Sequence, residues 1–222
     1  MRFKARERED VVRAIADCGV VAVVRMKEPD KLSAVVSALA EGGLRVIEVT
    51  MTVPRAIEMI ADLAPGLPKG VLIGAGTVLD AATACRAIEA GAQFVVGPAF
   101  RPEVIAECHR HEVPALPGCF TPTEILSAWE AGADIVKVFP ATSLGPRFLK
   151  DLHGPLPDVK LMPTGGVTIE NAGDWIRAGA VAVGIGTALV DVKAIQEGDF
   201  RVLAANAQRV VANVQAAREA LR

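Results

Sequence analysis

The chain has 222 residues, 51% of them hydrophobic, and a formal net charge of −2 at pH 7. The hydrophobic fraction excludes a disordered chain, the balanced charge gives no reason to expect nucleic acid as a partner, and no apolar run is long enough to span a membrane. The N-terminal sequence MRFKARERED lacks the apolar core of a signal peptide. We therefore expect a soluble, cytoplasmic protein with a single domain over residues 1–222, beginning with a helix.

A repeated pattern runs along the chain, in which a helix end is followed by glycine and a short apolar run. The four copies are residues 41–48, 89–96, 130–137 and 177–184. Glycine ends a helix at this position because it adopts positive φ without a steric clash. The four glycines, at positions 43, 91, 132 and 179, are 48, 41 and 47 residues apart, and each interval has room for two strand–helix units of roughly 25–30 residues.

Further apolar runs between the repeats predict four more strands, at residues 20–25, 71–74, 115–117 and 160–162. Helix starts are expected at Val53-Pro54, Asp80, Arg101-Pro102, Thr121 and Thr168, where Thr121 and Glu124 form a capping box. An apolar stripe from Phe200 to Leu221 predicts a long last helix.

Eight strands that alternate with helices indicate an α/β protein with a parallel sheet. An open doubly wound sheet is the alternative, but the glycine-rich dinucleotide turn is missing after residues 20–25. We therefore predict a single (β/α)8 TIM barrel.

Side-chain alternation identifies two charged residues that point into this predicted barrel. In the run 46–50 the aliphatic Ile47 and Val49 suit the helix layer, which turns Glu48 inward. The same argument for residues 135–139 turns Lys137 and Phe139 inward. Both Glu48 and Lys137 stand five residues after their repeat glycine, so we expect them in one layer near the carboxyl ends of the strands, where barrel enzymes do their chemistry.

Two interpretations of Glu48 and Lys137 follow. One is a buried ion pair that fills a layer, although such pairs seldom stabilise a core more than aliphatic packing does. The other is a nucleophilic lysine with a proton-shuttling acid. Burial in an apolar strand favours the neutral amine that attacks a carbonyl, so this interpretation predicts Schiff-base chemistry on a keto substrate, with no metal and no cofactor.

Two glycine-rich turns follow the last two predicted strands, at residues 163–168 and 184–187. Backbone N–H groups of such turns bind phosphate in many barrels, and we expect a phosphate site there. Arg25 and Thr77 end two other strands. Arg25 is a candidate clamp for a carboxylate or phosphate, or an ordinary solvated arginine, and Thr77 is a candidate hydroxyl donor, or a turn residue.

The cysteines and histidines predict no further site. Cys18, Cys85, Cys108 and Cys119 form no C-x-x-C pair, and we expect them to be reduced. The pair His109-x-His111 has the spacing of metal ligands, but no third ligand is evident from the sequence, so no metal site is predicted.

The sequence resembles the class I 2-dehydro-3-deoxy-6-phosphogluconate (KDPG) and 4-hydroxy-2-oxoglutarate (KHG) aldolases over about residues 19–190. The matching stretches are VVAVVR (20–25), EGGLRVIEVT (41–50), GAGTV (74–78), KVFPA (137–141), PTGGV (163–167) and GIGTALV (184–190).

The resemblance implies a role for each of these motifs. It assigns the Schiff base to Lys137 and the acid–base role to Glu48. It implies that Arg25 and Thr77 hold the keto-acid end of the substrate and that Thr164 influences the stereochemical preference. Phosphate contacts are implied for Gly165, Gly166, Gly186 and Thr187, and Phe139 is also a predicted substrate-binding residue. Many members have arginine where this chain has Thr52, so carboxylate binding is expected to depend on Arg25, Thr77 and backbone N–H groups.

The activity implied is cleavage of KDPG to pyruvate and D-glyceraldehyde 3-phosphate, and of KHG to pyruvate and glyoxylate, in a homotrimer of the Entner–Doudoroff pathway. The alternatives are an aldolase for the galactonate epimer, a phosphate-binding isomerase or synthase with Lys137 as general acid, and a barrel that binds a phosphorylated metabolite without catalysis.

Overall fold

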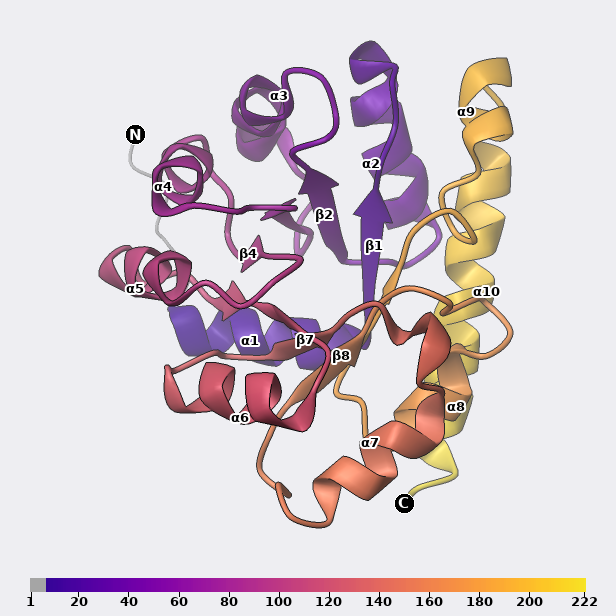
Figure 1. Ribbon diagram of the computed structural model, residues 1–222. Coiled ribbons are helices and arrows are strands. Elements are labelled where there is room, and N and C mark those ends of the chain that lie inside the picture. Colours follow the sequence, from indigo (N-terminus) through magenta and orange to yellow (C-terminus); the bar gives the residue numbers. More distant parts are fainter. Residues whose placement is uncertain (1–6) are drawn as a thin grey trace.

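The computed structural model describes residues 7–222, in which helices and short strands alternate along the chain (Figure 1). The strands are β1 (Val20–Val24), β2 (Val46–Thr50), β3 (Leu72–Gly76), β4 (Val95–Val96), β5 (Ala115–Leu116), β6 (Gly118–Cys119), β7 (Val136–Val138), β8 (Leu161–Pro163) and β9 (Val183–Ile185). The α-helices are α1 (Arg8–Cys18), α2 (Leu32–Glu41), α3 (Ala56–Leu63), α4 (Ala81–Glu89), α5 (Pro102–Arg110), α6 (Pro122–Glu130), α7 (Pro146–His153), α8 (Ala172–Arg177), α9 (Val192–Glu197) and α10 (Arg201–Glu219). Short 3-10 helices cover Pro29–Lys31, Ala64–Gly66 and Ala141–Ser143.

The strands are all parallel, but they form two sheets rather than a closed barrel. One sheet has six strands in the order β5-β4-β3-β2-β1-β9, and the other has three in the order β6-β7-β8. The predicted single (β/α)8 TIM barrel is therefore wrong for the hydrogen-bonded structure of residues 7–222. Pro117, which has no N–H to donate, separates β5 from β6. The two sheets are joined at β8 and β9 by an isolated bridge from Thr164 to Gly184 and by a hydrogen bond from the Val181 amide to the Leu161 carbonyl.

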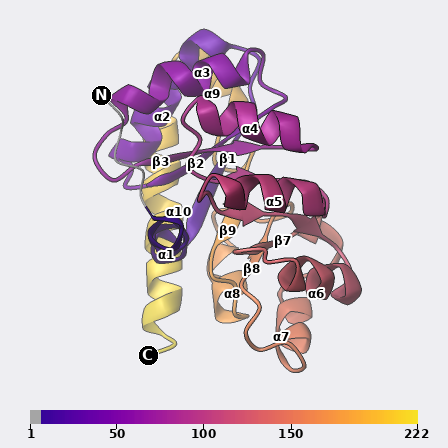
Figure 2. The same cartoon turned by 90° about the vertical axis from the view of Figure 1, so that its left-hand side faces the viewer.

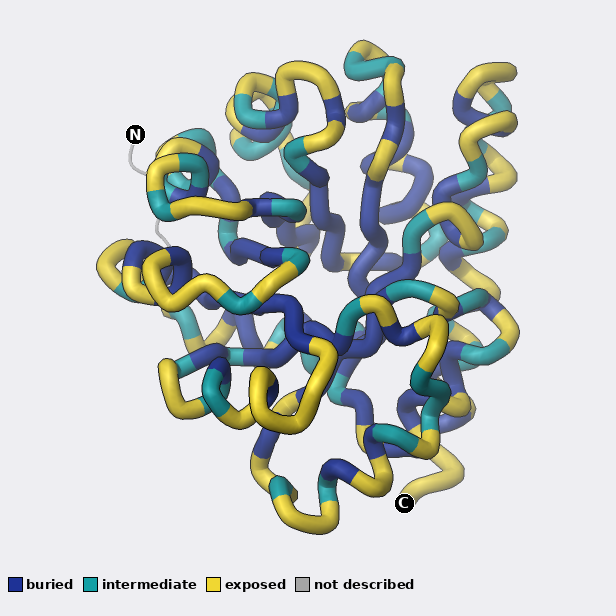
Figure 3. The backbone as a smooth tube through the Cα atoms, viewed as in Figure 1, coloured by how far each residue is buried: buried dark blue, intermediate teal, exposed yellow. Residues whose placement is uncertain are grey.

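The helix ends follow the repeated glycine pattern. Gly43, Gly91, Gly132 and Gly179 have φ values of 89°, 107°, 92° and 104°, which confirms the predicted left-handed backbone after each helix. Each is followed by the short loop that returns the chain to a buried strand (Figure 3).

Three of the predicted helix starts are confirmed. Asp80 caps α4 by accepting from the amide of Thr83, Arg101 precedes α5, and Thr121 and Glu124 form the predicted capping box of α6. The other two helices begin later than predicted. Helix α3 begins at Ala56, and α8 begins at Ala172, because Thr168 and Asn171 first close a turn through their backbone amides and side-chain oxygens.

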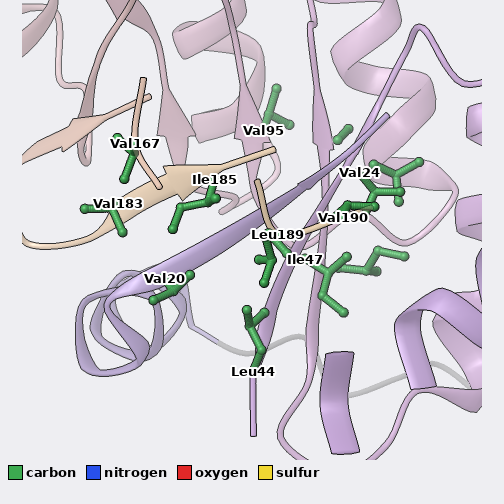
Figure 4. Close-up of a cluster of buried hydrophobic side chains, with 14 of the residues drawn as sticks. Val20, Val24, Leu44, Ile47, Val95, Val167, Val183, Ile185, Leu189 and Val190 are labelled. Carbon is green, nitrogen blue, oxygen red and sulfur yellow. The ribbon is translucent and has the colours of Figure 1, made fainter. Parts of the chain in front are cut away.

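Side-chain alternation divides the core into two clusters, one on each face of the strands. The larger cluster lies between the strands and the surrounding helices and includes Ile47, Val49, Val136 and Val138. Figure 4 shows part of this cluster, with Ile47 beside Leu44 and Leu189. The smaller cluster lies on the opposite, concave face, and its strand residues are Val21, Val46, Leu72, Phe94, Val96, Leu116, Ile135, Met162 and Ala182. This division confirms the predicted orientation of the strands that carry Glu48 and Lys137.

Helix α1 packs against the concave face through Val11, Val12 and Ile15, and crosses near one end of the strands (Figures 1 and 2). Helix α10 buries the predicted stripe from Leu203 to Ala217 against α2 and α8, whereas Leu221 lies beyond its end and is 60% exposed. Among the helices of residues 7–222, none combines the length and the hydropathy that crossing a membrane requires.

Candidate active site

Glu48 lies in the middle of β2 and is completely buried. It is flanked by Val23 of β1 and Gly74 of β3 in the parallel ladder. Within the part of the chain that the structure describes, neither carboxylate oxygen has a hydrogen-bond partner. Burial raises the pKa of this carboxyl, and the positive charges of Lys137 and, to a lesser degree, Arg25 oppose the shift.

Lys137 lies in the middle of β7 and is 5% exposed. Its neighbours in the ladder are Gly118 and Met162. The ammonium Nζ lies 5.0 Å from the ring centroid of Phe139, within the distance of a cation–π interaction. Phe139 itself follows the strand, is half-buried, and is joined to Pro140 by a cis peptide bond.

The structure brings Glu48 and Lys137 together without a direct ion pair. Lys137 is the charged group with the largest lowering effect on the pKa of Glu48, yet no N···O contact within 4.0 Å joins the two among the ion pairs of residues 7–222. The absence of a direct contact within 4.0 Å argues against a simple buried ion pair and favours the chemical interpretation.

Arg25 and Thr77 lie just beyond the carboxyl ends of β1 and β3, as the sequence predicted. Arg25 is exposed, and its charge reaches Glu48, whose pKa it lowers. Thr77 is half-buried and has a φ of 60°, an uncommon backbone conformation for a residue that is not glycine.

Thr164 follows β8 and is buried, and its Oγ1 has no hydrogen-bond partner in the described chain. It bridges to Gly184 of β9, where a Cβ would collide with the Thr164 hydroxyl. The next two residues are Gly165 and Gly166, with φ values of 90° and 72°. Only glycine adopts such angles readily, so the turn after β8 depends on both.

The turn after β9 lies beside this one, because Thr164 and Gly184 are bridged. Gly186 is half-buried, Thr187 is exposed, and the carbonyl of Gly186 accepts from the amides of Leu189 and Val190. The structure thus brings together the two glycine-rich turns in which the sequence predicted a phosphate site.

Sequence reasoning missed two features of the site. The first is Gly76 of β3, which faces the Glu48 carboxylate. The small residues of the run 74–76 were the sequence feature that could have indicated this close approach. The hydroxyl of Thr50, which is buried two residues after Glu48, donates to the carbonyl of Val24 at 3.2 Å and contacts the hydroxyl of Thr52 at 2.6 Å.

Burial makes two of the four free cysteines poor nucleophiles. It raises the pKa of the Cys108 and Cys119 thiols to about 12, and nucleophilic chemistry by a cysteine needs a thiolate.

Comparisons with known proteins agree with this chemistry. The family model "Aldolase: KDPG and KHG aldolase" matches residues 11–205. The 2-dehydro-3-deoxy-phosphogluconate aldolase of Treponema pallidum (strain Nichols) is 37% identical over 90% of this chain and 96% of its own length. The 2-dehydro-3-deoxy-6-phosphogalactonate aldolase of Escherichia coli (strain K12) is 34% identical over 91% of this chain and 96% of its own length.

A solved structure extends the comparison. The KDPG aldolase of Legionella pneumophila, with pyruvate captured at low pH as a covalent carbinolamine intermediate, has a TM-score of 0.83 at 30% identity and covers 90% of this chain and 97% of that chain.

Proposed function

Because the chain belongs to the KDPG and KHG aldolase family, we propose that it cleaves KDPG to pyruvate and D-glyceraldehyde 3-phosphate through a Schiff base on Lys137. The chain is an aldolase and hence a carbon–carbon lyase. The observation that carries the assignment of residues is the buried Lys137 amine beside a buried Glu48 whose oxygens have no hydrogen-bond partner in the described chain. KHG, cleaved to pyruvate and glyoxylate, is the second expected substrate.

The Lys137 amine attacks the C2 carbonyl of the keto acid and forms a carbinolamine. Loss of water from the carbinolamine gives a protonated imine. Removal of the C4 hydroxyl proton then breaks the C3–C4 bond, whose electrons move into the imine to form an enamine, and the aldehyde leaves. Protonation at C3 and hydrolysis release pyruvate and the free lysine. The imine is the electron sink, so the cleavage uses no metal or cofactor.

Glu48 is the group that moves protons in these steps. A carboxyl whose pKa is raised by burial is better matched to both accepting and donating protons near neutral pH than an exposed carboxyl is. Its oxygens are not occupied by hydrogen bonds from the described chain, which leaves them available for a substrate hydroxyl or a water.

Substrate binding uses the residues around this pair. Arg25 and Thr77 bind the carboxylate end of the keto acid. Phe139 and the Thr164 hydroxyl, which has no hydrogen-bond partner in the described chain, lie beside the reacting carbons of the substrate. The phosphate is bound by the two turns, which contain Gly165, Gly166, Gly186 and Thr187. This division is supported by the adjacency of the two turns and by the reach of the Arg25 charge to Glu48.

Trapping with borohydride tests the Schiff base. Incubation with pyruvate and sodium borohydride should add one reduced pyruvate to the peptide that contains Lys137, as measured by mass spectrometry, because only an imine is reduced to a stable adduct. The variant Lys137→Met should not be labelled, whereas a matched change of an exposed lysine, Lys150→Met, should leave labelling intact. Labelling at another lysine, or at none, contradicts the assignment and favours an isomerase or synthase.

The galactonate epimer of KDPG is an alternative main substrate, favoured by the relative from Escherichia coli. The two epimers differ at C4, whose hydroxyl loses a proton during cleavage. Pyruvate release coupled to lactate dehydrogenase measures kcat/KM for each epimer. A lower kcat/KM for KDPG than for the galactonate epimer would make that epimer the preferred substrate. Turnover of neither epimer would favour a protein that only binds a phosphorylated metabolite.

We also propose that the chain is one domain, that it works as a homotrimer, and that it serves the Entner–Doudoroff pathway in the cytoplasm. The packing of α10 against both α2 and α8 supports a single domain. A monomeric mass in light scattering would refute the trimer.

A further inference from the structure

Three potential metal ligands from two neighbouring helices meet away from Glu48 and Lys137. Cys85 belongs to α4, Glu107 belongs to α5, and His111 directly follows α5. Each offers one donor atom, and the three atoms lie within 4.8 Å of one another. The two helices are adjacent on the outside of the six-stranded sheet (Figures 1 and 2).

We propose that Cys85, Glu107 and His111 form a binding site for one zinc ion that links α4 to α5. The Nε2 atom of His111 lies 3.8 Å from the Sγ of Cys85 and 3.1 Å from the Oε1 of Glu107. In a tetrahedral zinc site, metal–ligand distances of about 2.3 Å to sulfur and about 2.0–2.1 Å to nitrogen and oxygen separate sulfur from nitrogen by about 3.6 Å and nitrogen from oxygen by about 3.3 Å. Both measured separations are thus close to those around a bound zinc ion, and the Cys85 sulfur and the Glu107 oxygen lie within 4.8 Å of each other.

The surroundings of Glu107 hold its carboxylate in the orientation that binding requires. Glu107 is 5% exposed, and its second oxygen, Oε2, is paired with the guanidinium of Arg110. The Arg110 contact leaves Oε1 facing His111. Hydrogen bonds of this kind to a ligating carboxylate orient it toward the metal.

Solvent reaches the other side of the cluster. His111 is exposed and Cys85 is half-buried, and a cavity of about 530 Å³ is lined by His111 together with Ile88 and Gln93. Zinc therefore has an entry path, and water can supply its fourth ligand.

The donor set favours zinc over the hard cations. A thiolate and an imidazole suit zinc, whereas magnesium and calcium prefer oxygen ligands. The Cys85 thiolate and the Glu107 carboxylate contribute two negative charges to the ion's surroundings, and Arg110 adds one positive charge at the outer oxygen of Glu107. Because the cluster does not include Glu48 or Lys137, we expect zinc to stabilise the packing of α4 on α5 and to leave catalysis unchanged.

The sequence did not reveal this cluster because Cys85 lies on a different helix from Glu107 and 26 residues before His111, although Glu107 and His111 are only four residues apart. The pair His109-x-His111 draws attention to two histidines, but His109 Nε2 lies 3.4 Å from the carboxylate of Asp134 instead. His111 instead contacts Glu107 and Cys85. The proposal therefore departs from the sequence-based prediction of no metal site.

Cobalt(II) titration of the reduced, metal-stripped full chain tests the proposal, because thiolate-bound cobalt has a charge-transfer band that zinc lacks. We expect saturation at one cobalt per chain, the visible bands of a tetrahedral site, and loss of all bands when zinc is added. Cys85→Ser should abolish the charge-transfer band. The control Cys18→Ser, at the other half-buried cysteine, should keep it. An absence of saturable binding, or a charge-transfer band that survives in Cys85→Ser, would overturn the proposal.

Thermal unfolding gives a second readout that does not depend on Cys85. Zinc at about a hundred times its Kd should raise the Tm of the unaltered chain by roughly 5–10 °C. His111→Ala, at an exposed position where folding tolerates the change, should show no such rise and should keep its aldolase activity. A rise of the same size in His111→Ala would exclude this site.

Discussion

Gly76 provides the space that the Glu48 side chain occupies. A Cβ built on Gly76 would overlap Oε1, Cδ and Cγ of Glu48. Gly76 pairs with Thr50 in the ladder and does not have a left-handed φ, so the need for glycine here comes from the neighbouring carboxylate and not from the backbone. The position of the acid relative to Lys137 thus depends on a residue that has no side chain of its own.

Gly76→Ala should lower kcat about 10²-fold, because a displacement of about 1 Å is enough to cost that factor at a catalytic group. Trapping of pyruvate on Lys137 should persist, since the lysine is on another strand. The matched control is Gly66→Ala, because a Cβ on Gly66 meets no atom within 4 Å. Steady-state kinetics on both variants measure this effect. A normal kcat in Gly76→Ala would mean that catalysis tolerates a displacement of the Glu48 side chain.

Glu48→Gln should lower kcat by about 10²–10⁴-fold, the usual contribution of general acid–base catalysis. Glutamine keeps the volume and a polar tip but cannot take up a proton. KM should change far less, because the phosphate-binding turns are untouched. A kcat close to that of the unaltered enzyme, in a variant shown to be folded, would end the assignment of Glu48 as the proton shuttle.

Arg25→Gln should act on both binding and pH dependence. Its charge lowers the pKa of Glu48, so its removal raises that pKa further and should move the acid-side limb of the kcat–pH profile to higher pH. KM for the keto acid should rise because a carboxylate partner is lost. Arg13→Gln, at an exposed residue of α1 paired with Asp10, should leave both unchanged. If KM rises in Arg25→Gln but the acid-side limb of the kcat–pH profile does not move, Arg25 binds the substrate without affecting the titration of Glu48.

The strand and helix pattern was predictable because local signals express it directly. The repeat glycines, the Asp80 cap and the Thr121 capping box each act through the backbone of a few neighbouring residues, and all appear where predicted. Closure of the sheet was not predictable in this way. It depends on pairing between distant strands, and Pro117 removes one N–H from that pairing.

The orientation of Glu48 and Lys137 was predictable for the same reason, because side chains alternate along a strand and each therefore points to a known face of the sheet. The contribution of Gly76 was not, because overlap with Glu48 requires the register of β3 on β2. The cluster of Cys85 and His111 likewise depends on how α4 packs on α5. Contacts between elements are not encoded by a local pattern.

The stability of Glu48→Gln as a function of pH separates an unpaired buried acid from one half of an ion pair. Burial raises the pKa of Glu48 in the folded chain above the value of 4.5 expected for the unfolded chain. Between these two pKa values the folded state binds more protons than the unfolded state, so stability falls as pH rises through this window and stays lower above it. Glutamine does not titrate and avoids this loss.

Glu48→Gln should therefore be more stable than the unaltered chain at pH 8, and the difference should shrink as pH falls toward 4.5, the unfolded-state value. Urea unfolding at a series of pH values, at which both proteins are folded, measures the free energy of unfolding directly. If Glu48 instead served as the partner of a buried Lys137 ammonium, the glutamine variant would leave that charge uncompensated and would be less stable at pH 8. A variant that is more stable but has a much lower kcat would show that this site gives up stability to hold a proton-transferring acid beside the lysine.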